Sequence, residues 1–153
     1  MSAGSTKIVV GVDGSPSSRA ALRWAVRQAV LTGETVDAVM AWQFPMVLRT
    51  SAWAPIYVDE AVGLEQDTRK ALDAVISDEV VPADRRLVTV RIVQGDPTQV
   101  LREAAADAGL LVLGSRGHGS FADALIGSVG QYCVHHVHCP VLIMRGEPHR
   151  AAA

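Results

Sequence analysis

The stretch KIVVGVDGSP, residues 7–16, indicates a strand, a tight turn and the start of a helix. Residues 8–12 are continuously apolar and rich in β-branched side chains, which is typical of a strand buried on both faces of a parallel sheet. Ser15 is a good N-cap, and Pro16 suits the first helical position, where a missing N–H loses no hydrogen bond. Apolar residues at helical spacing continue towards Gly33, which predicts the end of this helix.

The alternation of strand and helix repeats along the chain. Strands are predicted over 7–12, 35–42, 87–93, 110–113 and 140–144. Asp59 is predicted to cap a long second helix, Asp96-Pro97 begins a third helix as Ser15-Pro16 begins the first, and a short fourth helix covers 128–137. Polar side chains interrupt the strand at 87–93, which predicts that this strand lies at an edge of the sheet.

Five strands alternating with four helices predict a doubly wound α/β fold, with one parallel sheet in the strand order 3-2-1-4-5. Ligands of such folds bind at the carboxyl ends of the strands, near the switch in strand order. We expect one domain over residues 7–145, with flexible tails at 1–6 and 146–153.

The composition excludes several classes of protein. The chain has 153 residues, of which 49% are hydrophobic and 20% are charged, so it is neither disordered nor long enough for two ordinary domains. Its net charge of -2, without a long basic run, argues against nucleic-acid binding. We find no membrane-spanning run and no secretory signal, and therefore expect a cytoplasmic protein. Two cysteines, Cys133 and Cys139, are too few for a disulfide scaffold.

The stretch GSRGHGS, residues 114–120, carries most of the functional information because it directly follows the predicted central strand. Gly114 and Gly117 allow successive N–H groups to turn towards one point, which forms a nest for an anion. Nine residues further on, Gly127-Ser128 begins a helix whose N-terminal N–H groups form a second anion site. Two such sites at one sheet edge suit a diphosphate or triphosphate; the alternative is a set of turn glycines without a ligand.

Other phosphate-binding motifs are absent from the sequence. It has neither the Walker loop with its lysine nor, in the first turn, the Gly-x-Gly-x-x-Gly of dinucleotide-binding proteins. Asp13 ends the first strand at the same edge and could accept hydrogen bonds from ribose hydroxyls or hold a metal through water; its alternative role is that of a turn residue. Arg116 and His118 could contact phosphate or point to solvent.

Three stretches of the chain together resemble one known family. They are the spacing Gly114-x2-Gly117-x9-Gly127-Ser128, the opening IVVGVDGS at 8–15 and the ending CPVLIMR at 139–145. The residue types in these stretches, and the order of the stretches along the chain, are similar to those of the ATP-binding branch of the universal stress proteins. The similarity extends over roughly residues 7–145. The chain departs from the family pattern at Gly109, where an Asp is usual, and at Gly130, where Ser or Thr is commoner.

The resemblance implies ATP as the ligand, with Mg²⁺ held mainly by the phosphates. Asp13 and the backbone at Gly11, Val12 and Ala41 would hold the adenosine. The ribose and phosphates would be wrapped by Leu113, Gly114, Ser115, Arg116, Gly117, His118 and Gly119, and the phosphate site would be closed by Gly127, Ser128 and Val129. The family also implies a homodimer paired through the last strand.

Two further regions have competing interpretations. Cysteines and histidines crowd into residues 133–139, but successive positions point around a helix, so buried thiols and helix-end histidines are favoured over a metal site. The connection over residues 43–58 is long and irregular, and it is interpreted as a lid near the adenosine end or as a loop folded over the second helix.

The sequence favours an ATP-binding regulatory protein over an enzyme. Catalysis of phosphoryl transfer would need a general base or a cationic clamp at the γ-phosphate. The two lysines, Lys7 and Lys70, lie elsewhere, and only Asp13 and His118 are near. The alternatives are a slow ATPase or adenylyl transferase in the same cleft, and a dimeric interaction protein that binds AMP, a cyclic nucleotide or no ligand. The sequence identifies neither the stress or pathway nor the protein partner.

Overall fold

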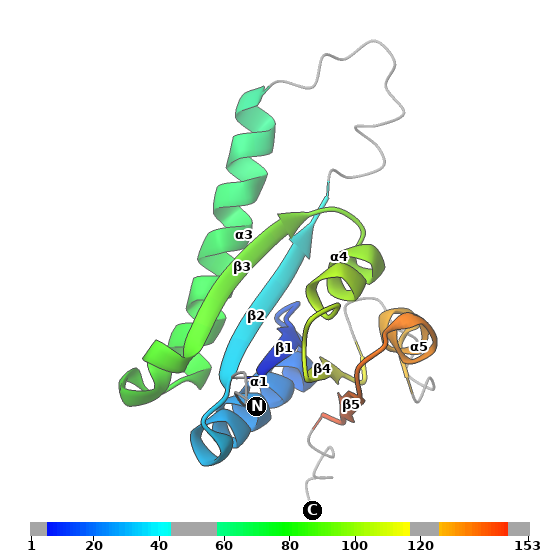
Figure 1. Ribbon diagram of the computed structural model, residues 1–153. Helices are drawn as coiled ribbons and strands as arrows, with labels where there is room; N and C mark the ends of the chain where they lie inside the picture. Colours follow the sequence, from blue (N-terminus) through cyan, green and yellow to red (C-terminus); the bar gives the residue numbers. More distant parts are fainter. Residues whose placement is uncertain (1–5, 44–57, 117–125, 147–153) are drawn as a thin grey trace, which may run out of the picture.

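The computed structural model describes residues 6–43, 58–116 and 126–146 (Figure 1). The strands are β1 (Lys7–Gly11), β2 (Thr35–Trp42), β3 (Val88–Gln94), β4 (Leu110–Gly114) and β5 (Val141–Met144). The helices are α1 (Pro16–Thr32), α3 (Val58–Glu79), α4 (Pro97–Ala104) and α5 (Ser128–His136), with a 3-10 helix at Pro82–Leu87. The predicted alternation of strands and helices is confirmed.

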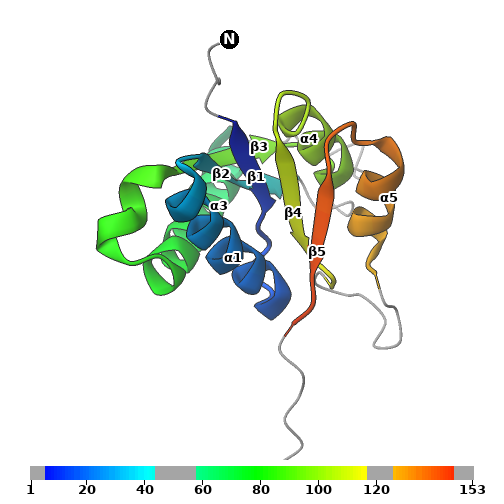
Figure 2. The same ribbon diagram turned by 60° about the horizontal axis from the view of Figure 1, so that its bottom comes forward.

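All five strands form one parallel sheet in the order β3-β2-β1-β4-β5, as predicted. Figure 2 shows β1, β4 and β5 side by side. β3 lies at one edge, which confirms the prediction made from its polar residues, and β5 lies at the other. The chain reverses its direction of travel across the sheet between β1 and β4, so the carboxyl ends of these two strands mark the place where such folds bind ligands.

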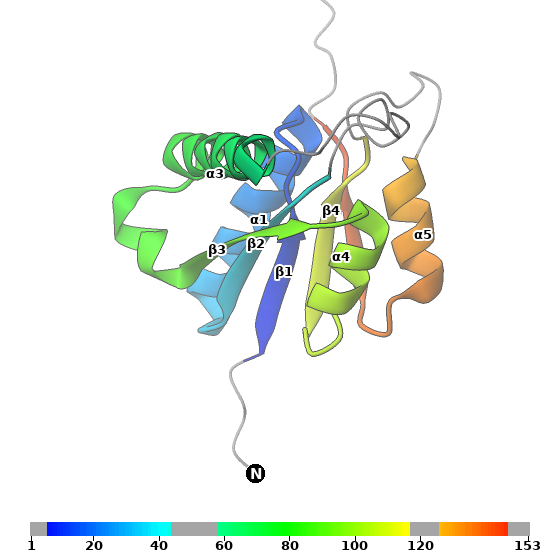
Figure 3. The same ribbon diagram turned by 90° about the horizontal axis from the view of Figure 1, so that it is seen from above.

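Helices cover both faces of the sheet (Figure 3). On one face, α1 and α3 bury Leu22 and Leu72 against residues of β1 and β2 such as Ile8 and Val36. On the other, α4 and α5 pack over a second apolar cluster, which contains Val9, Val39, Leu101, Leu111 and Cys133. Because both faces are covered, β1 and β4 carry continuous apolar runs, over residues 8–10 and 110–113, rather than an alternating pattern.

Capping residues fix where the helices begin and end. Ser15 accepts a hydrogen bond from the Ser18 N–H, and Asp96 accepts one from the Thr98 N–H, as the cap-and-proline pattern predicts. Gly33 ends α1 in the left-handed conformation, with φ of 79°. The prediction that Asp59 caps the second helix is wrong, because α3 already includes Val58.

The structure describes only a small part of the predicted tails and of the predicted long connection. Thr6, which the sequence assigns to the flexible tail, donates a 2.6 Å hydrogen bond from Oγ1 to Glu34 Oε1. The predicted lid or folded loop at 43–58 lies largely outside the described residues, as do residues 1–5 and 147–153 of the predicted tails. None of the helices within 6–43, 58–116 and 126–146 combines the length and hydrophobicity that crossing a bilayer requires.

Candidate functional site

The carboxyl end of β1 leads into a tight turn that is held by its own side chains. The Ser15 N–H donates to Asp13 Oδ1 at 2.9 Å, and the Asp13 N–H donates to Ser18 Oγ at 3.3 Å. Gly14 adopts the left-handed conformation, with φ of 83°, which favours glycine at this position. Asp13 is exposed, so its carboxylate both closes the turn and faces the solvent at this edge. Its role as a turn residue is therefore established, and a ligand role stays a prediction.

Gly11 and Val12 connect β1 to the neighbouring strands. A Cβ at Gly11 would lie 2.7 Å from Leu113 Cδ2 and 3.2 Å from Leu101, so only glycine lets the end of β1 pack this closely against β4 and α4. Val12 is buried, and its N–H donates to Val39 O at 2.9 Å. These two residues present backbone rather than side chains at the switch point.

At the end of β2, Ala41 is half-buried against the cluster under α4 and α5. The next residue, Trp42, accepts a 2.8 Å hydrogen bond at its carbonyl oxygen from the Gly95 N–H. This bond joins the ends of β2 and β3 and helps to position Asp96, the cap of α4, at the same edge of the sheet.

Gly114 ends β4 where α1 passes closest to the sheet. A Cβ there would lie 2.4 Å from Ser17 Oγ and 2.6 Å from the Ser18 backbone nitrogen, so the missing side chain makes room for the first turn of α1. The preceding residue, Leu113, is buried at 4% exposure. Glycine at this position is thus explained by helix–strand packing; whether it also contacts a ligand stays a prediction.

Ser115 and Arg116 leave β4 attached to three other elements. The Ser115 N–H donates to Met144 O at 2.7 Å, which ties it to β5. The Ser115 carbonyl accepts the Gly127 N–H at 2.8 Å, which ties it to the start of α5. The backbone of Arg116 is bonded to the hydroxyl of Ser17 on α1, while its side chain is exposed.

The bond between Ser115 and Gly127 joins the two halves of the glycine motif. Gly127 has φ of -70° and ψ of 170° and no side-chain cap within the described residues, and α5 begins directly after it. Ser128 is exposed and Val129 is half-buried. The N–H groups in the first turn of a helix have no acceptors within that helix, so α5 presents donors beside Ser115.

The structure thus brings most of the predicted site residues to one edge of the sheet. The members with described positions there are Gly11, Val12, Asp13, Ala41, Leu113, Gly114, Ser115, Arg116, Gly127, Ser128 and Val129. Gly117, His118 and Gly119 lie outside the described residues. Sequence reasoning missed Ser17. The only signal for it is that Ser17 and Ser18 follow Ser15 in a first helical turn that needs one capping residue.

The predicted cluster at 133–139 does not converge on one point. Cys133 is fully buried, and this burial, followed by the effect of Cys139, raises the pKa of its thiol to about 11. His135, His136 and His138 are exposed, and the ring of His136 stacks on Tyr132 with centroids 4.1 Å apart. Within the ranges that the structure describes, no group of three or more His, Cys, Asp or Glu side chains is arranged to hold a metal ion.

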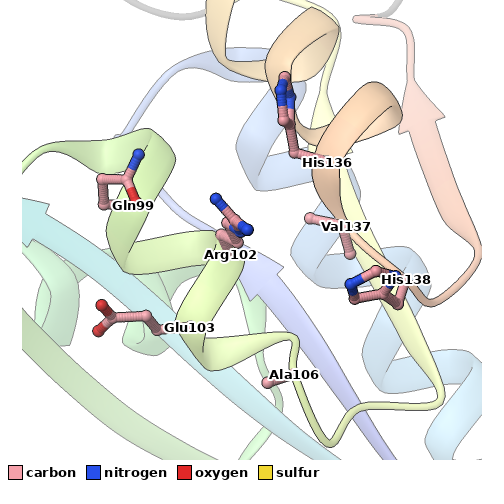
Figure 4. Close-up of a pocket in the computed structure, with 7 residues that line it drawn as sticks. All are labelled: Gln99, Arg102, Glu103, Ala106, His136, Val137 and His138. Atoms are coloured by element: carbon pink, nitrogen blue, oxygen red, sulfur yellow. The ribbon is translucent and has the colours of Figure 1, made fainter.

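A separate open cavity of about 360 Å³ lies between α4 and α5 (Figure 4). It is lined by Gln99, Arg102, Glu103, Ala106, His136, Val137 and His138. Of these lining residues, His136 is the last residue of α5, and Val137 and His138 lie in the connection to β5, whereas Ser128 begins that helix. This cavity is therefore distinct from the edge that carries the glycine motif.

Comparisons with known proteins agree on one family. Residues 4–145 match the sequence profile of the Universal stress protein family. Universal stress protein Rv1996 of Mycobacterium tuberculosis is 32% identical over 94% of this chain and 49% of its own length. Universal stress protein Rv2623 of the same species is 32% identical over 96% of this chain and 50% of its own length. The chain therefore spans about half the length of the curated relatives it matches.

Solved structures share the fold. UspA from Lactobacillus plantarum superimposes with a TM-score of 0.65 at 25% identity, covering 92% of this chain and 98% of the other. A universal stress protein in complex with cAMP gives 0.59 at 29% identity, covering 92% and 97%. The Archaeoglobus fulgidus protein in complex with dAMP gives 0.60 at 22% identity, covering 91% and 97%, and at that identity it is evidence for the fold alone.

Proposed function

The chain belongs to the universal stress protein family, and from this membership we propose that it is an ATP-binding regulatory protein. The observation that carries the proposal is the 2.8 Å hydrogen bond from the Gly127 N–H to the Ser115 carbonyl. It closes the base of the glycine motif, so that the N-terminal donors of α5 lie beside the residues that leave β4. The N–H groups in the first turn of α5 suit one phosphate group, and the proposal assigns a second set of donors to the glycine-rich stretch that follows Arg116.

In this proposal the nucleotide lies across the switch point of the sheet. Asp13 and the backbone at Gly11, Val12 and Ala41 hold the adenosine. The phosphates lie between the segment from Leu113 to Gly119 and the first turn of α5, from Gly127 to Val129. Mg²⁺ is bound chiefly by the phosphate oxygens, which is the usual arrangement for this ion with nucleotides.

A cyclic nucleotide or AMP is the second candidate ligand. It is favoured by the relative that was solved in complex with cAMP, which is 29% identical to this chain. A monophosphate would need only one of the two anion sites, whereas a triphosphate would use both. The number of phosphates on the bound nucleotide therefore distinguishes the two candidates.

The positions of the lysines support binding rather than dedicated catalysis. Lys7 Nζ lies 3.0 Å from Asp107 Oδ1 and 3.3 Å from Asp37 Oδ2, at the amino end of β1. Lys70 lies on α3. Neither is available to clamp a γ-phosphate at the carboxyl edge, so we expect at most slow hydrolysis of ATP.

We further propose a cytoplasmic homodimer that pairs through β5. This strand pairs only with β4 among the described strands, and its four residues, Val141–Met144, are all half-buried. An apolar edge strand of this kind is a template for pairing with another chain. The molar mass, measured by light scattering as the protein elutes from a size-exclusion column at several loading concentrations, tests the dimer. The mass of a monomer at every concentration contradicts it.

The first experiment is to denature freshly purified, untagged protein and to identify the released nucleotide by chromatography. We expect an adenine nucleotide near one per chain, with three phosphates. Release of AMP or a cyclic nucleotide instead would identify the second candidate as the ligand. If nothing is released, titration with ATP decides, and the absence of binding at millimolar ATP contradicts the proposal.

A further inference from the structure

Three buried serines lie in and before the first turn of α1. Ser15, Ser17 and Ser18 are 6%, 4% and 3% exposed. Two of them serve the turn itself: Ser15 Oγ accepts the Ser18 N–H at 3.3 Å, and Ser18 Oγ donates to Ser15 O at 3.0 Å. Ser18 Oγ also accepts the Asp13 N–H. Ser15 and Ser18 thus stabilise the turn that presents Asp13.

Ser17 makes a different set of contacts. Its hydroxyl donates to the carbonyl oxygen of Arg116 at 2.8 Å and accepts the Arg116 N–H at 3.3 Å, across 99 residues of sequence. Gly114 makes this contact possible, because any Cβ there would fall 2.4 Å from Ser17 Oγ. One buried hydroxyl therefore satisfies both backbone groups of Arg116, the last described residue before the glycine-rich stretch continues.

We infer that Ser17 is a positioning residue that sets the phosphate-binding half of the site relative to α1. The inference rests on the proposed function and deepens it, since it assigns the two halves of the nucleotide to two neighbouring serines. Ser18 supports the Asp13 turn, on the adenosine side. Ser17 supports Arg116, on the phosphate side.

The two serines should therefore have separable effects on binding. Replacing Ser17 by Ala leaves the N–H and carbonyl of Arg116 without their buried partner, so the backbone of Arg116 loses its fixed position beside α1. Phosphates should then be bound less tightly, while adenosine should be bound as before. Loss of the Ser18 hydroxyl should weaken the binding of ATP and of adenosine by the same factor, because both ligands use the Asp13 side.

The test compares Ser17→Ala with Ser18→Ala as the matched control, by calorimetric titration with ATP and with adenosine. We expect Ser17→Ala to weaken ATP binding about five- to tenfold, the loss typical of one or two neutral hydrogen bonds, and to change adenosine binding less than about twofold. Ser17→Thr, which retains the hydroxyl, should restore most of the ATP affinity. A Ser17→Ala variant that weakens both ligands equally, or neither, overturns the inference.

Amide hydrogen exchange of the protein without nucleotide provides an independent measurement. Ser17→Ala should accelerate exchange at the Arg116 amide about tenfold, while Ser18→Ala should leave it unchanged. If the wild-type chain binds neither ATP nor adenosine, the proposed function fails, and unchanged exchange at Arg116 would then show that the attachment to Ser17 fails as well. Accelerated exchange with unaltered ATP affinity overturns the positioning role alone.

Discussion

The first turns of α1 and α5 both follow a central strand of the sheet, but they differ in what satisfies their N–H groups. At α1, Ser15 accepts the Ser18 N–H, and Pro16 has no N–H at the first helical position. At α5, Gly127 provides no side-chain cap within the described residues, and Ser128 occupies the position that Pro16 occupies in α1. The first turn of α1 therefore has a side-chain acceptor for the Ser18 N–H and no N–H at Pro16, whereas α5 has neither feature and presents its donors at the edge of the sheet.

The start of α4 follows the pattern of α1. Asp96 accepts the Thr98 N–H at 2.9 Å and is followed by Pro97. Among the helices at this edge, the residue before the first helical position is described for α1, α4 and α5; two of these are capped by side chains and proline, and one is not. Glycine in place of a capping side chain costs only about a few tenths of a kcal/mol, but it leaves the N–H groups of the first turn of α5 without a side-chain acceptor. In the proposed function, the phosphates of the nucleotide supply the acceptors at the start of α5.

The largest expected effect comes from placing a negative charge at the uncapped helix. Gly127→Glu adds a carboxylate next to the predicted phosphate site, and repulsion should reduce ATP affinity by at least about 100-fold, to below detection in equilibrium dialysis. Gly127 has an ordinary extended conformation, so a side chain is tolerated by the backbone. Gly127→Gln is the matched control, since it has the same size and no charge. ATP affinity that is the same in both variants would contradict a phosphate at this position.

A smaller effect is expected from converting the start of α5 to the pattern of α1. Ser128→Pro removes one N–H, and the φ of -70° and ψ of 170° at Gly127 suit a residue that precedes proline. Because proline is favoured at this position, thermal stability should be retained while ATP affinity falls about tenfold, the value of a hydrogen bond to a charged group. Ser128→Ala removes only the hydroxyl and isolates the contribution of the N–H.

The reverse substitution completes this test. Pro16→Ala restores an N–H to α1, which already has its cap, and should leave ATP affinity unchanged. If Ser128→Pro and Ser128→Ala bind ATP equally, the first N–H of α5 is not a ligand donor, and the distinction between the two helices has no functional meaning.

Much of this fold is predictable from local sequence, because its signals are local. The pairs Ser15-Pro16 and Asp96-Pro97 identify two helix starts, and the apolar runs identify the central strands. A cap at Asp59 predicts a helix that begins two residues late, because Val58, which carries no capping signal, is already helical.

The candidate site is only partly predictable, since its assembly depends on contacts between distant segments. The motif spacing identifies Gly114 and Gly127 in the sequence, but the bond that joins Ser115 to Gly127 depends on how β4 and α5 pack. Ser17 could not be assigned to the site, because its partner Arg116 lies 99 residues away. Similarly, the sequence gives no sign that a Cβ at Gly114 would meet α1, and the predicted contact of Gly114 with a ligand stays a prediction.

The smallest expected effect concerns the pH dependence of a capped helix. Hydrogen bonds from the side chain and backbone of Thr98 lower the pKa of Asp96 below its usual value. A carboxyl group whose pKa is lower in the folded state contributes stability that is present above its unfolded pKa of about 3.9 and is lost as the pH falls through the folded pKa. Asp96→Asn keeps a capping side chain but removes the charge that interacts with the dipole of α4. Because Asp96 is exposed, solvent screens this charge and the effect is small.

Thermal unfolding of wild type and Asp96→Asn at a series of pH values measures this effect. The wild type should melt at a slightly higher temperature at pH 7, and the difference should shrink as the pH falls below about 4 and then through the lower pKa of the folded state. At every pH the two proteins should bind ATP equally, because the donors at the start of α4 already have a partner in the cap. A loss of ATP affinity in Asp96→Asn would mean that a capped helix start also contributes to the site, and would remove the distinction between α4 and α5.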